Sequence, residues 1–138
     1  MSKHFKLNPC DIRAVWDEVR PGLEAIKAEW PDSNTWRPED VYAMVVNNDA
    51  ILYQTEDGFA VCTIDIDRWT GRRDLFIWLA YSPEAKRGGI LKKYWPSFIE
   101  VAERLECAGI QTGSLSPALA AFSEMDPSYT TYRYEITW

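Results

Sequence analysis

The residue types that usually carry nucleophilic or metal chemistry are sparse in this chain. Its single histidine, His4, lies in the N-terminal segment, so a Ser-His-Asp or Cys-His relay has little support. The three cysteines, Cys10, Cys62 and Cys107, are widely spaced and form no CxxC pair. We interpret them as reduced and buried. No cluster of metal-ligand residues is visible, and we expect no metal site.

Trp69 suggests a contact surface in place of a reaction centre. It lies in a turn and is surrounded by Arg68, Arg72 and Arg73. Trp and Arg are enriched at the energetic centres of protein interfaces. The pattern is compatible with an exposed contact surface and with an aromatic ring folded back on the sheet, and the sequence slightly favours the folded-back ring.

Charge and hydrophobicity exclude several classes of protein. Fifteen basic against 21 acidic residues give a net charge of -6, which disfavours binding to a phosphate backbone, so we expect no nucleic acid partner. The hydrophobic fraction of 46% is ample for a folded core. No apolar run approaches the roughly 18 residues that span a bilayer, and the N-terminus has no apolar segment after its positive charges. We therefore expect neither export nor membrane insertion.

The first part of the chain reads as two helices. Asn8 is predicted to cap the first helix, with Pro9 at the first helical position. Apolar residues then recur at spacings of three and four as far as Trp30. Pro21 is expected to kink or divide this helix. A second, shorter helix is predicted over 38–45.

Three β-rich runs follow, over 50–54, 59–67 and 75–81, with turn signals between them that indicate an antiparallel meander. Alternation in the middle run places two sets of side chains on opposite faces. One set is Phe59, Val61, Thr63 and Asp65, and the other is Ala60, Cys62, Ile64 and Ile66. The third run is apolar on both faces and is expected to be a central strand.

A glycine-containing loop and a long helix come next. Pro96 favours a helix start at Lys92 or Lys93, because a proline at the edge of the first turn loses no hydrogen bond. The helix is expected to end near Ala108 and Gly109. A strand over 110–115, a short helix over 117–122 and a closing strand over 129–138 complete the prediction. The predicted fold class is α+β, a single domain over 1–138 with a central mixed, mostly antiparallel twisted sheet flanked by helices.

This order of elements resembles the GCN5-related N-acetyltransferase superfamily over nearly the whole chain. In that superfamily, the loop after the fourth strand holds the coenzyme A pyrophosphate with its backbone amides. The corresponding residues here are Lys86, Arg87, Gly88, Gly89 and Ile90. Glycine lets the backbone approach phosphates closely, and a helix N-terminus supplies amides and a positive dipole. The resemblance implies acetyl-CoA or CoA as cofactor, while a solvent-exposed turn explains the same residues equally well.

The motif departs from the superfamily pattern at three positions. Lys86 replaces the usual Gln or Arg, and Leu91 occupies the final small position. Ser123 stands where the superfamily often has a tyrosine that protonates the leaving thiolate, and a serine hydroxyl is a poor general acid. Tyr129 or Tyr132 is a substitute donor, although packing in a core or strand is the favoured role for both.

A general base would come from Asp65 or Asp67, because a substrate ammonium must lose a proton before it attacks. Solvent-facing strand carboxylates are the favoured alternative for these two residues. The resemblance therefore implies catalytic roles for Asp65, Ser123 and Tyr129 and leaves enzymatic activity uncertain.

Two functions follow from the resemblance. The first is an N-acyltransferase that uses acetyl-CoA and a small amine. The second is a non-catalytic module with a protein partner, similar to the small acetyltransferase-like proteins of tailed phages and prophages in length, aromatic content and proline-interrupted helix. The expected location is the cytoplasm of a bacterial host, or the virion for a phage protein. The sequence leaves the acyl acceptor and the oligomeric state open.

Overall fold

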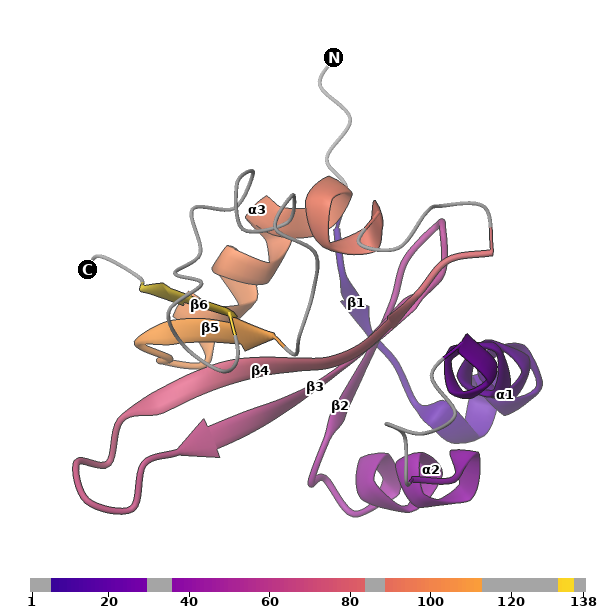
Figure 1. The fold of residues 1–138 in the computed structure, drawn as a ribbon, viewed down its shortest axis with the longest axis horizontal. Helices are drawn as coiled ribbons and strands as arrows, with labels where there is room; N and C mark the ends of the chain where they lie inside the picture. Colours follow the sequence, from indigo (N-terminus) through magenta and orange to yellow (C-terminus); the bar gives the residue numbers. More distant parts are fainter. Residues whose placement is uncertain (1–5, 30–35, 84–88, 113–131, 136–138) are drawn as a thin grey trace.

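The structure, a computed structural model, describes residues 6–29, 36–83, 89–112 and 132–135. Its elements in chain order are β1 (Asn8–Pro9), α1 (Ile12–Glu29), α2 (Pro38–Val46), β2 (Ile51–Gln54), β3 (Phe59–Ile66), β4 (Arg73–Tyr81), α3 (Gly89–Arg104), β5 (Gly109–Thr112) and β6 (Tyr132–Glu135) (Figure 1).

The described strands form one mixed sheet in the order β1-β2-β3-β4-β5-β6. All neighbouring pairs are antiparallel except β4 and β5, which run parallel and are joined through α3. A parallel pair needs such a crossover because its strands begin at the same end of the sheet. The predicted α+β class, the three-stranded meander and the central position of the strand after the second turn are confirmed.

Both faces of the sheet are covered by helices (Figure 1). We call the first cluster of buried side chains the α3-side core; it includes Tyr53, Ala60, Cys62, Leu75, Ile77, Tyr94, Phe98 and Ile110. The opposite cluster, the α1/α2-side core, includes Ile12, Val19, Leu23, Val41, Leu52, Phe59, Val61 and Leu79. The predicted alternation along β3 is therefore correct in its buried half, since Phe59 and Val61 face one core and Ala60 and Cys62 the other.

The predicted cap of the first helix is wrong. Asn8 and Pro9 form an edge strand paired with Gln54 and Tyr53 of β2, a position that suits proline because its missing N–H is not needed on an outer edge. Asp11 takes the capping role, since its Oδ1 accepts a hydrogen bond from the Arg13 amide at 3.0 Å. The helix then begins at Ile12 and runs through Pro21 to Glu29 without division.

The helix after β4 begins earlier than predicted, at Gly89, so Pro96 lies in its interior. The Pro96 ring lies on the exposed side of the helix. Tyr94 and Phe98 on the opposite side are 1% and 0% exposed. Burial of these aromatic rings offsets the hydrogen bond that proline removes.

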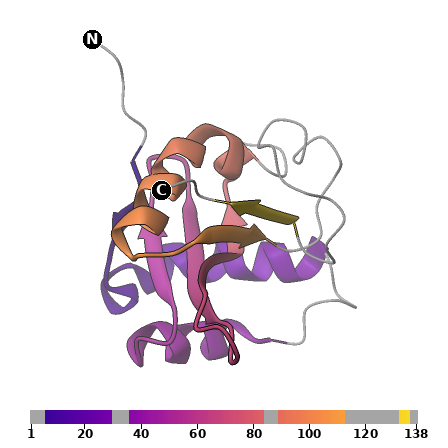
Figure 2. The same ribbon diagram turned by 90° about the vertical axis from the view of Figure 1, so that its left-hand side faces the viewer.

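The β3–β4 hairpin projects from the body of the protein, at the left of Figure 1 and towards the viewer in Figure 2. Asp67 organises its turn, because its Oδ1 accepts hydrogen bonds from the amides of Trp69 at 2.8 Å and Thr70 at 2.9 Å. Trp69 is 88% exposed at the tip. The folded-back interpretation of its ring is therefore wrong.

The three cysteines are free thiols, of which Cys62 and Cys107 are buried and Cys10 is half-buried. Burial raises the pKa of the Cys62 thiol, so this group stays protonated and unreactive near neutral pH. No helix in the described ranges is long and apolar enough to cross a membrane. Residues 6–29, 36–83, 89–112 and 132–135 contain no group of three or more side chains suited to a metal ion.

Candidate functional site

A β-bulge interrupts β4 at Trp78. Val61 of β3 pairs with Leu79, and the next residue, Cys62, pairs with Ile77, so Trp78 is the extra residue. In consequence two successive side chains, Trp78 and Leu79, face the α1/α2-side core, while Ile77 before them faces the α3-side core. Bulges bend strands and end regular pairing, and they are over-represented beside functional sites.

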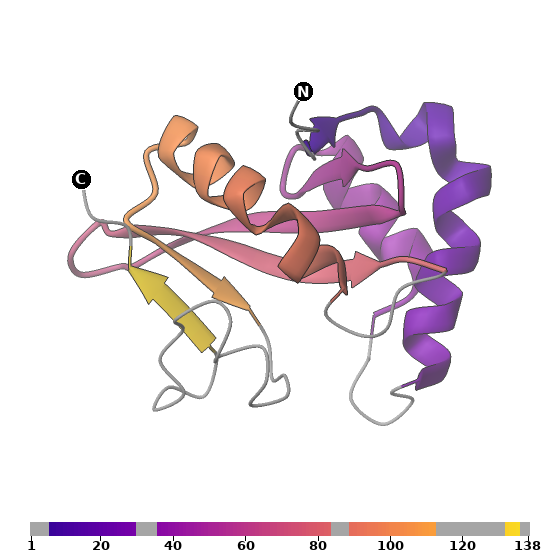
Figure 3. The same ribbon diagram turned by 90° about the horizontal axis from the view of Figure 1, so that it is seen from above.

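Beyond the bulge, β4 has no strand partner on its β5 side among the described residues, and we call this stretch the open edge of β4. The described parallel pairing joins Asp74 through Ile77 to Gly109 through Thr112, the last described residue of β5, whereas β4 continues to Tyr81 with β3 on its other side. Figure 3 shows β5 diverging from β4 in this direction. Within the described residues, the backbone groups of 78–81 on this edge have no strand partner. A ligand with amide groups could take up those hydrogen bonds.

Close packing fixes the end of β4. A Cβ on Gly58 would collide with the backbone carbonyl of Tyr81, and a Cβ on Gly22 of α1 would lie 2.5 Å from the rings of Phe59 and Tyr81. The rings of Phe59 and Tyr81 are themselves in contact, with centroids 5.7 Å apart. Because glycine has no Cβ, Gly58 of the β2–β3 turn and Gly22 of α1 can both pack directly against Tyr81, the last residue of β4.

An aromatic wall flanks the open edge on the α1/α2 side. The half-buried rings of Trp36 and Trp78 meet edge to face, with centroids 6.1 Å apart. Trp36 precedes α2, and the ammonium of Lys27, near the end of α1, lies 6.0 Å from its ring centroid. The electron-rich face of this indole thus already holds a cation in the folded protein.

The N-terminus of α3 is the second component of the site. Gly89 and Ile90 are the first two residues of the helix, and its first turn holds no acidic residue. The sequence places Lys92 and Lys93 soon after them. Basic residues near the positive end of a helix dipole are unfavourable unless an anion or carboxylate lies close to them.

The structure places only some of the sequence-predicted site residues. Gly89 and Ile90 open α3, as stated above, whereas Lys86, Arg87, Gly88, Ser123 and Tyr129 lie outside the described residues. Asp65 is exposed on β3 and pairs with Asp74. The loop after β4 leaves from the other end of this hairpin, where Phe59 pairs with Tyr81. The register therefore does not bring Asp65 to the open edge of β4.

Solved structures resemble this fold over nearly its whole length. A crystal structure of a probable acetyltransferase matches with a TM-score of 0.68 and 11% sequence identity, and the match covers 96% of this chain and 99% of the other. A tetramutant of the BH1408 protein from Bacillus halodurans matches at 0.61 and 16% identity, over 96% and 99% of the two chains. An integron cassette protein from the mobile metagenome of V. cholerae matches at 0.56 and 16% identity, over 89% and 84%.

The chain shares the fold of these structures, one of which is a probable acetyltransferase. No protein-family model and no curated protein matches the chain. The identities of the structural matches are low, so the likeness is one of fold. The fold class and the acetyltransferase-like architecture expected from the order of elements are thereby confirmed.

In this acetyltransferase-like fold, the sequence reasoning missed the bulge at Trp78. An apolar run gives no signal of an extra residue, because the run remains apolar on both faces whichever way its side chains alternate. Sequence reasoning also missed Asp57, which lies in the β2–β3 turn and contacts α3. Its only signal was that of a turn residue.

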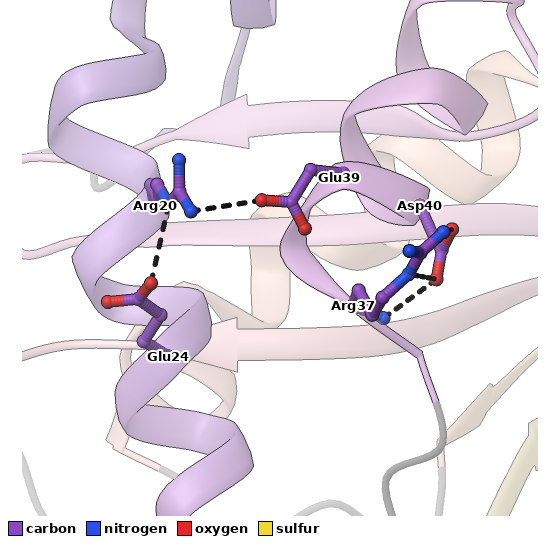
Figure 4. A network of polar contacts seen from close by, with 5 residues as sticks. All are labelled: Arg20, Glu24, Arg37, Glu39 and Asp40. Carbon is purple, nitrogen blue, oxygen red and sulfur yellow. Dashed lines mark hydrogen bonds and ion pairs between the residues drawn. The ribbon is translucent and has the colours of Figure 1, made fainter.

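A pocket of about 460 Å³ lies elsewhere in the fold, between α1 and α2. It is lined by Arg13, Ala14, Trp16, Asp17, Glu39 and Tyr42. Beside it Arg20 bridges the two helices, with ion pairs to Glu24 at 3.3 Å and Glu39 at 3.0 Å (Figure 4). Arg37 pairs with Asp40 at 3.1 Å and closes the start of α2. Of these exposed pairs only Arg20–Glu39 joins α1 to α2, and exposed ion pairs contribute little to stability.

Proposed function

We propose that the protein binds an acyl-coenzyme A along the open edge of β4 and transfers the acyl group to an amine. The observation that carries this proposal is the bulge at Trp78, after which β4 continues to Tyr81 with no partner on its β5 side among the residues that the structure describes. The pantetheine arm of coenzyme A contains two amide groups that suit an unpaired strand edge. The start of α3 at Gly89 would then receive the pyrophosphate.

The reaction would proceed by attack of a neutral amine nitrogen on the thioester carbonyl. The C–N bond forms, the C–S bond breaks, and the coenzyme leaves as a thiolate that takes up a proton, while the amine gives one up. Positioning of the two reactants and polarisation of the carbonyl by backbone groups would supply most of the rate enhancement. Asp65, the base expected from the sequence, lies at the other end of the β3–β4 hairpin, so the proposal gives it no part in the reaction. Ser123 or Tyr129 remains the predicted acid.

Calorimetric titration with acetyl-CoA and with CoA tests the proposal. We expect saturable one-to-one binding of both, weakened at least about tenfold by Gly89→Trp, because the large side chain blocks the approach to the start of α3. The matched control is Ala43→Trp, which adds the same side chain at an exposed position of α2. Absence of binding up to millimolar ligand, or equal binding by both variants, would contradict the proposal.

A second candidate function is a protein-binding module, and it rests on the exposed tip of the β3–β4 hairpin. Trp69 is 88% exposed and Ile66 is 60% exposed, and Asp67 holds the turn that presents Trp69. Residues 65–74 carry three acidic and three basic side chains, so the net charge of -6 resides in the rest of the chain. The rest of a second copy carries this negative charge and would attract Arg68, which lies next to Trp69 in the sequence. A virion-associated or assembly role would be one form of this function.

Sedimentation velocity at low and high salt tests the second candidate. We expect reversible self-association that weakens with added salt and is lost in Trp69→Ser, because the indole supplies the apolar contact. Val46→Ser on α2 removes another exposed apolar side chain and serves as the control. A monomer at all concentrations would exclude a second copy as the partner.

A further inference from the structure

The turn of the β3–β4 hairpin, residues 67–72, is held in one shape by its own hydrogen bonds, and we call it the hairpin tip. The Asp67 amide donates to the Arg72 carbonyl at 2.8 Å, and the Gly71 amide donates to the Asp67 carbonyl at 2.9 Å. The Thr70 hydroxyl accepts a hydrogen bond from the Arg72 amide at 3.2 Å. A loop that is bonded within itself loses little conformational entropy on binding, so the exposed Trp69 is preorganised for contact.

The hairpin tip also carries a basic side chain that is open to a partner. The guanidinium of Arg72 is already engaged, because it pairs with Asp74 at 3.2 Å. Arg68, next to Trp69, is exposed and has neither an ion pair nor a side-chain hydrogen bond with any residue that the structure describes. The tip therefore presents an indole beside an unpaired guanidinium, two groups that are enriched at the centres of protein interfaces.

The pocket between α1 and α2, here the α1/α2 pocket, has aromatic walls. Trp16 of α1 and Tyr42 of α2 are half-buried, and their rings meet edge to face with centroids 4.9 Å apart. The carboxylates of Asp17 and Glu39 line the same pocket. Its volume of about 460 Å³ is in the range that holds a drug-sized molecule, so it is large enough for one indole ring.

Among the described residues, one carboxylate of this pocket lacks a cation. Glu39 pairs with Arg20 at 3.0 Å. Arg13, the basic residue of the lining, pairs with Asp11 at 3.0 Å. Asp17 is exposed and makes no ion pair or side-chain hydrogen bond within the described ranges. A guanidinium brought to the pocket from outside would find this carboxylate as its partner.

The hairpin tip and the α1/α2 pocket lie at opposite ends of the molecule. Figures 1 and 3 show the hairpin at the left and the two helices at the right. The sheet that carries the hairpin also packs against both helices, so one chain cannot bring its own tip to its own pocket. Any contact between these two surfaces must therefore join two copies of the chain, and it is heterologous because the surfaces differ.

We propose that the hairpin tip of one copy docks into the α1/α2 pocket of a second copy. Trp69 lies against the rings of Trp16 and Tyr42 in the second copy, and Arg68 pairs with its Asp17. The two surfaces match in chemistry, since each offers aromatic surface and one unpaired charge of opposite sign. This inference names the receiving surface of the second candidate function and rests on it, and it is independent of the acyl-transfer proposal.

Charge reversal on each side of the contact tests the inference by sedimentation velocity. Arg68→Glu and Asp17→Lys each place like charges opposite one another, so we expect each variant alone to self-associate at least about tenfold more weakly than the wild type. An equimolar mixture of the two variants should recover association, because each reversed side chain then meets an opposite charge. Glu103→Lys on α3 changes the net charge by the same amount as Asp17→Lys and, as the control, should associate like the wild type.

The outcomes separate this inference from the second candidate function. A wild type that is monomeric, or that associates equally well in Trp69→Ser, overturns both. If the wild type associates through Trp69 but Asp17→Lys associates as strongly, the tip contacts another surface and the inference alone is overturned. A mixture of the two charge-reversal variants that stays monomeric also overturns it, because the proposed pairing requires recovery.

Discussion

At the scale of the residue, position 58 accepts only glycine without a rearrangement of its neighbours. A Cβ at this position would overlap the Tyr81 carbonyl, and backbone atoms on both sides cannot move without disturbing β4. We expect Gly58→Ala to lower the free energy of unfolding by about 3 kcal/mol, measured by urea denaturation. Gly71→Ala is the control: Gly71 has φ +74° but open space around it, so only backbone strain of about 1 kcal/mol is expected. Equal effects of the two changes would contradict the packing argument.

The buried phenol of Tyr53 should make the protein less stable at alkaline pH. Burial raises the pKa of this phenol to about 12, while in the unfolded chain it ionises near its ordinary value of about 10. Below pH 10 both states keep the proton, so stability is unaffected. Between about pH 10 and 12 only the unfolded state loses it, and the free energy of unfolding should fall by about 2 kcal/mol. In denaturation experiments at a series of pH values, the free energy of unfolding of Tyr53→Phe should fall less steeply over this window than that of the wild type. An equal fall in both proteins would exclude Tyr53 as the cause.

At the scale of the element, a buried carboxylate joins β4 to β5. Asp74 is 3% exposed, and its oxygens accept hydrogen bonds from Gln111 at 2.6 Å and Arg72 at 3.2 Å. Asp74→Ala leaves both donors without this acceptor and should lower the free energy of unfolding by about 3 kcal/mol. Its cross-strand neighbour Asp65 is exposed, and Asp65→Ala should change stability by less than about 0.5 kcal/mol. Chemical denaturation of the two variants provides the comparison, and similar values would contradict the role assigned to Asp74.

Elements with strong periodicity were predictable from the sequence, and their boundaries were not. The alternation along β3 gave the correct faces because both cores bury its first four residues. Asn8 and Pro9 look like a helix start, yet pairing with β2 competes for the same residues and prevails. The helix start predicted from Pro96 was wrong for a similar reason, because burial of Tyr94 and Phe98 outweighs the preference of proline for a first turn.

The candidate site was predictable only in part for a related reason. Glycines after a strand and before a helix are visible in the sequence, and Gly89 does begin α3. The bulge at Trp78 depends on the register between β3 and β4, and the link from Asp57 to Tyr94 joins residues 37 positions apart. Neither relation leaves a local pattern, because both are set by how the elements pack.

At the scale of the whole molecule, the shared sheet predicts a single cooperative unfolding transition. Every residue of β3 from Phe59 to Cys62 is buried, and successive residues belong alternately to the α1/α2-side core and the α3-side core, so loss of one core exposes the strand that supports the other. Leu23→Ala on the α1/α2 side and Phe98→Ala on the α3 side should each lower the free energy of unfolding, by about 3 and 4 kcal/mol.

The decisive measurement follows each variant by two probes. Tryptophan fluorescence is measured in a Trp95→Phe background, because Trp95 packs against the α3-side core, whereas Trp16, Trp36 and Trp78 pack against the α1/α2-side core. Far-ultraviolet circular dichroism reports on all helices and strands together. If the sheet couples the two cores, both probes give the same midpoint in Leu23→Ala and in Phe98→Ala. An α3 that melts separately would instead lower the dichroism of Phe98→Ala before its fluorescence changes, and the proposed coenzyme site at the start of α3 would then be lost before the protein unfolds.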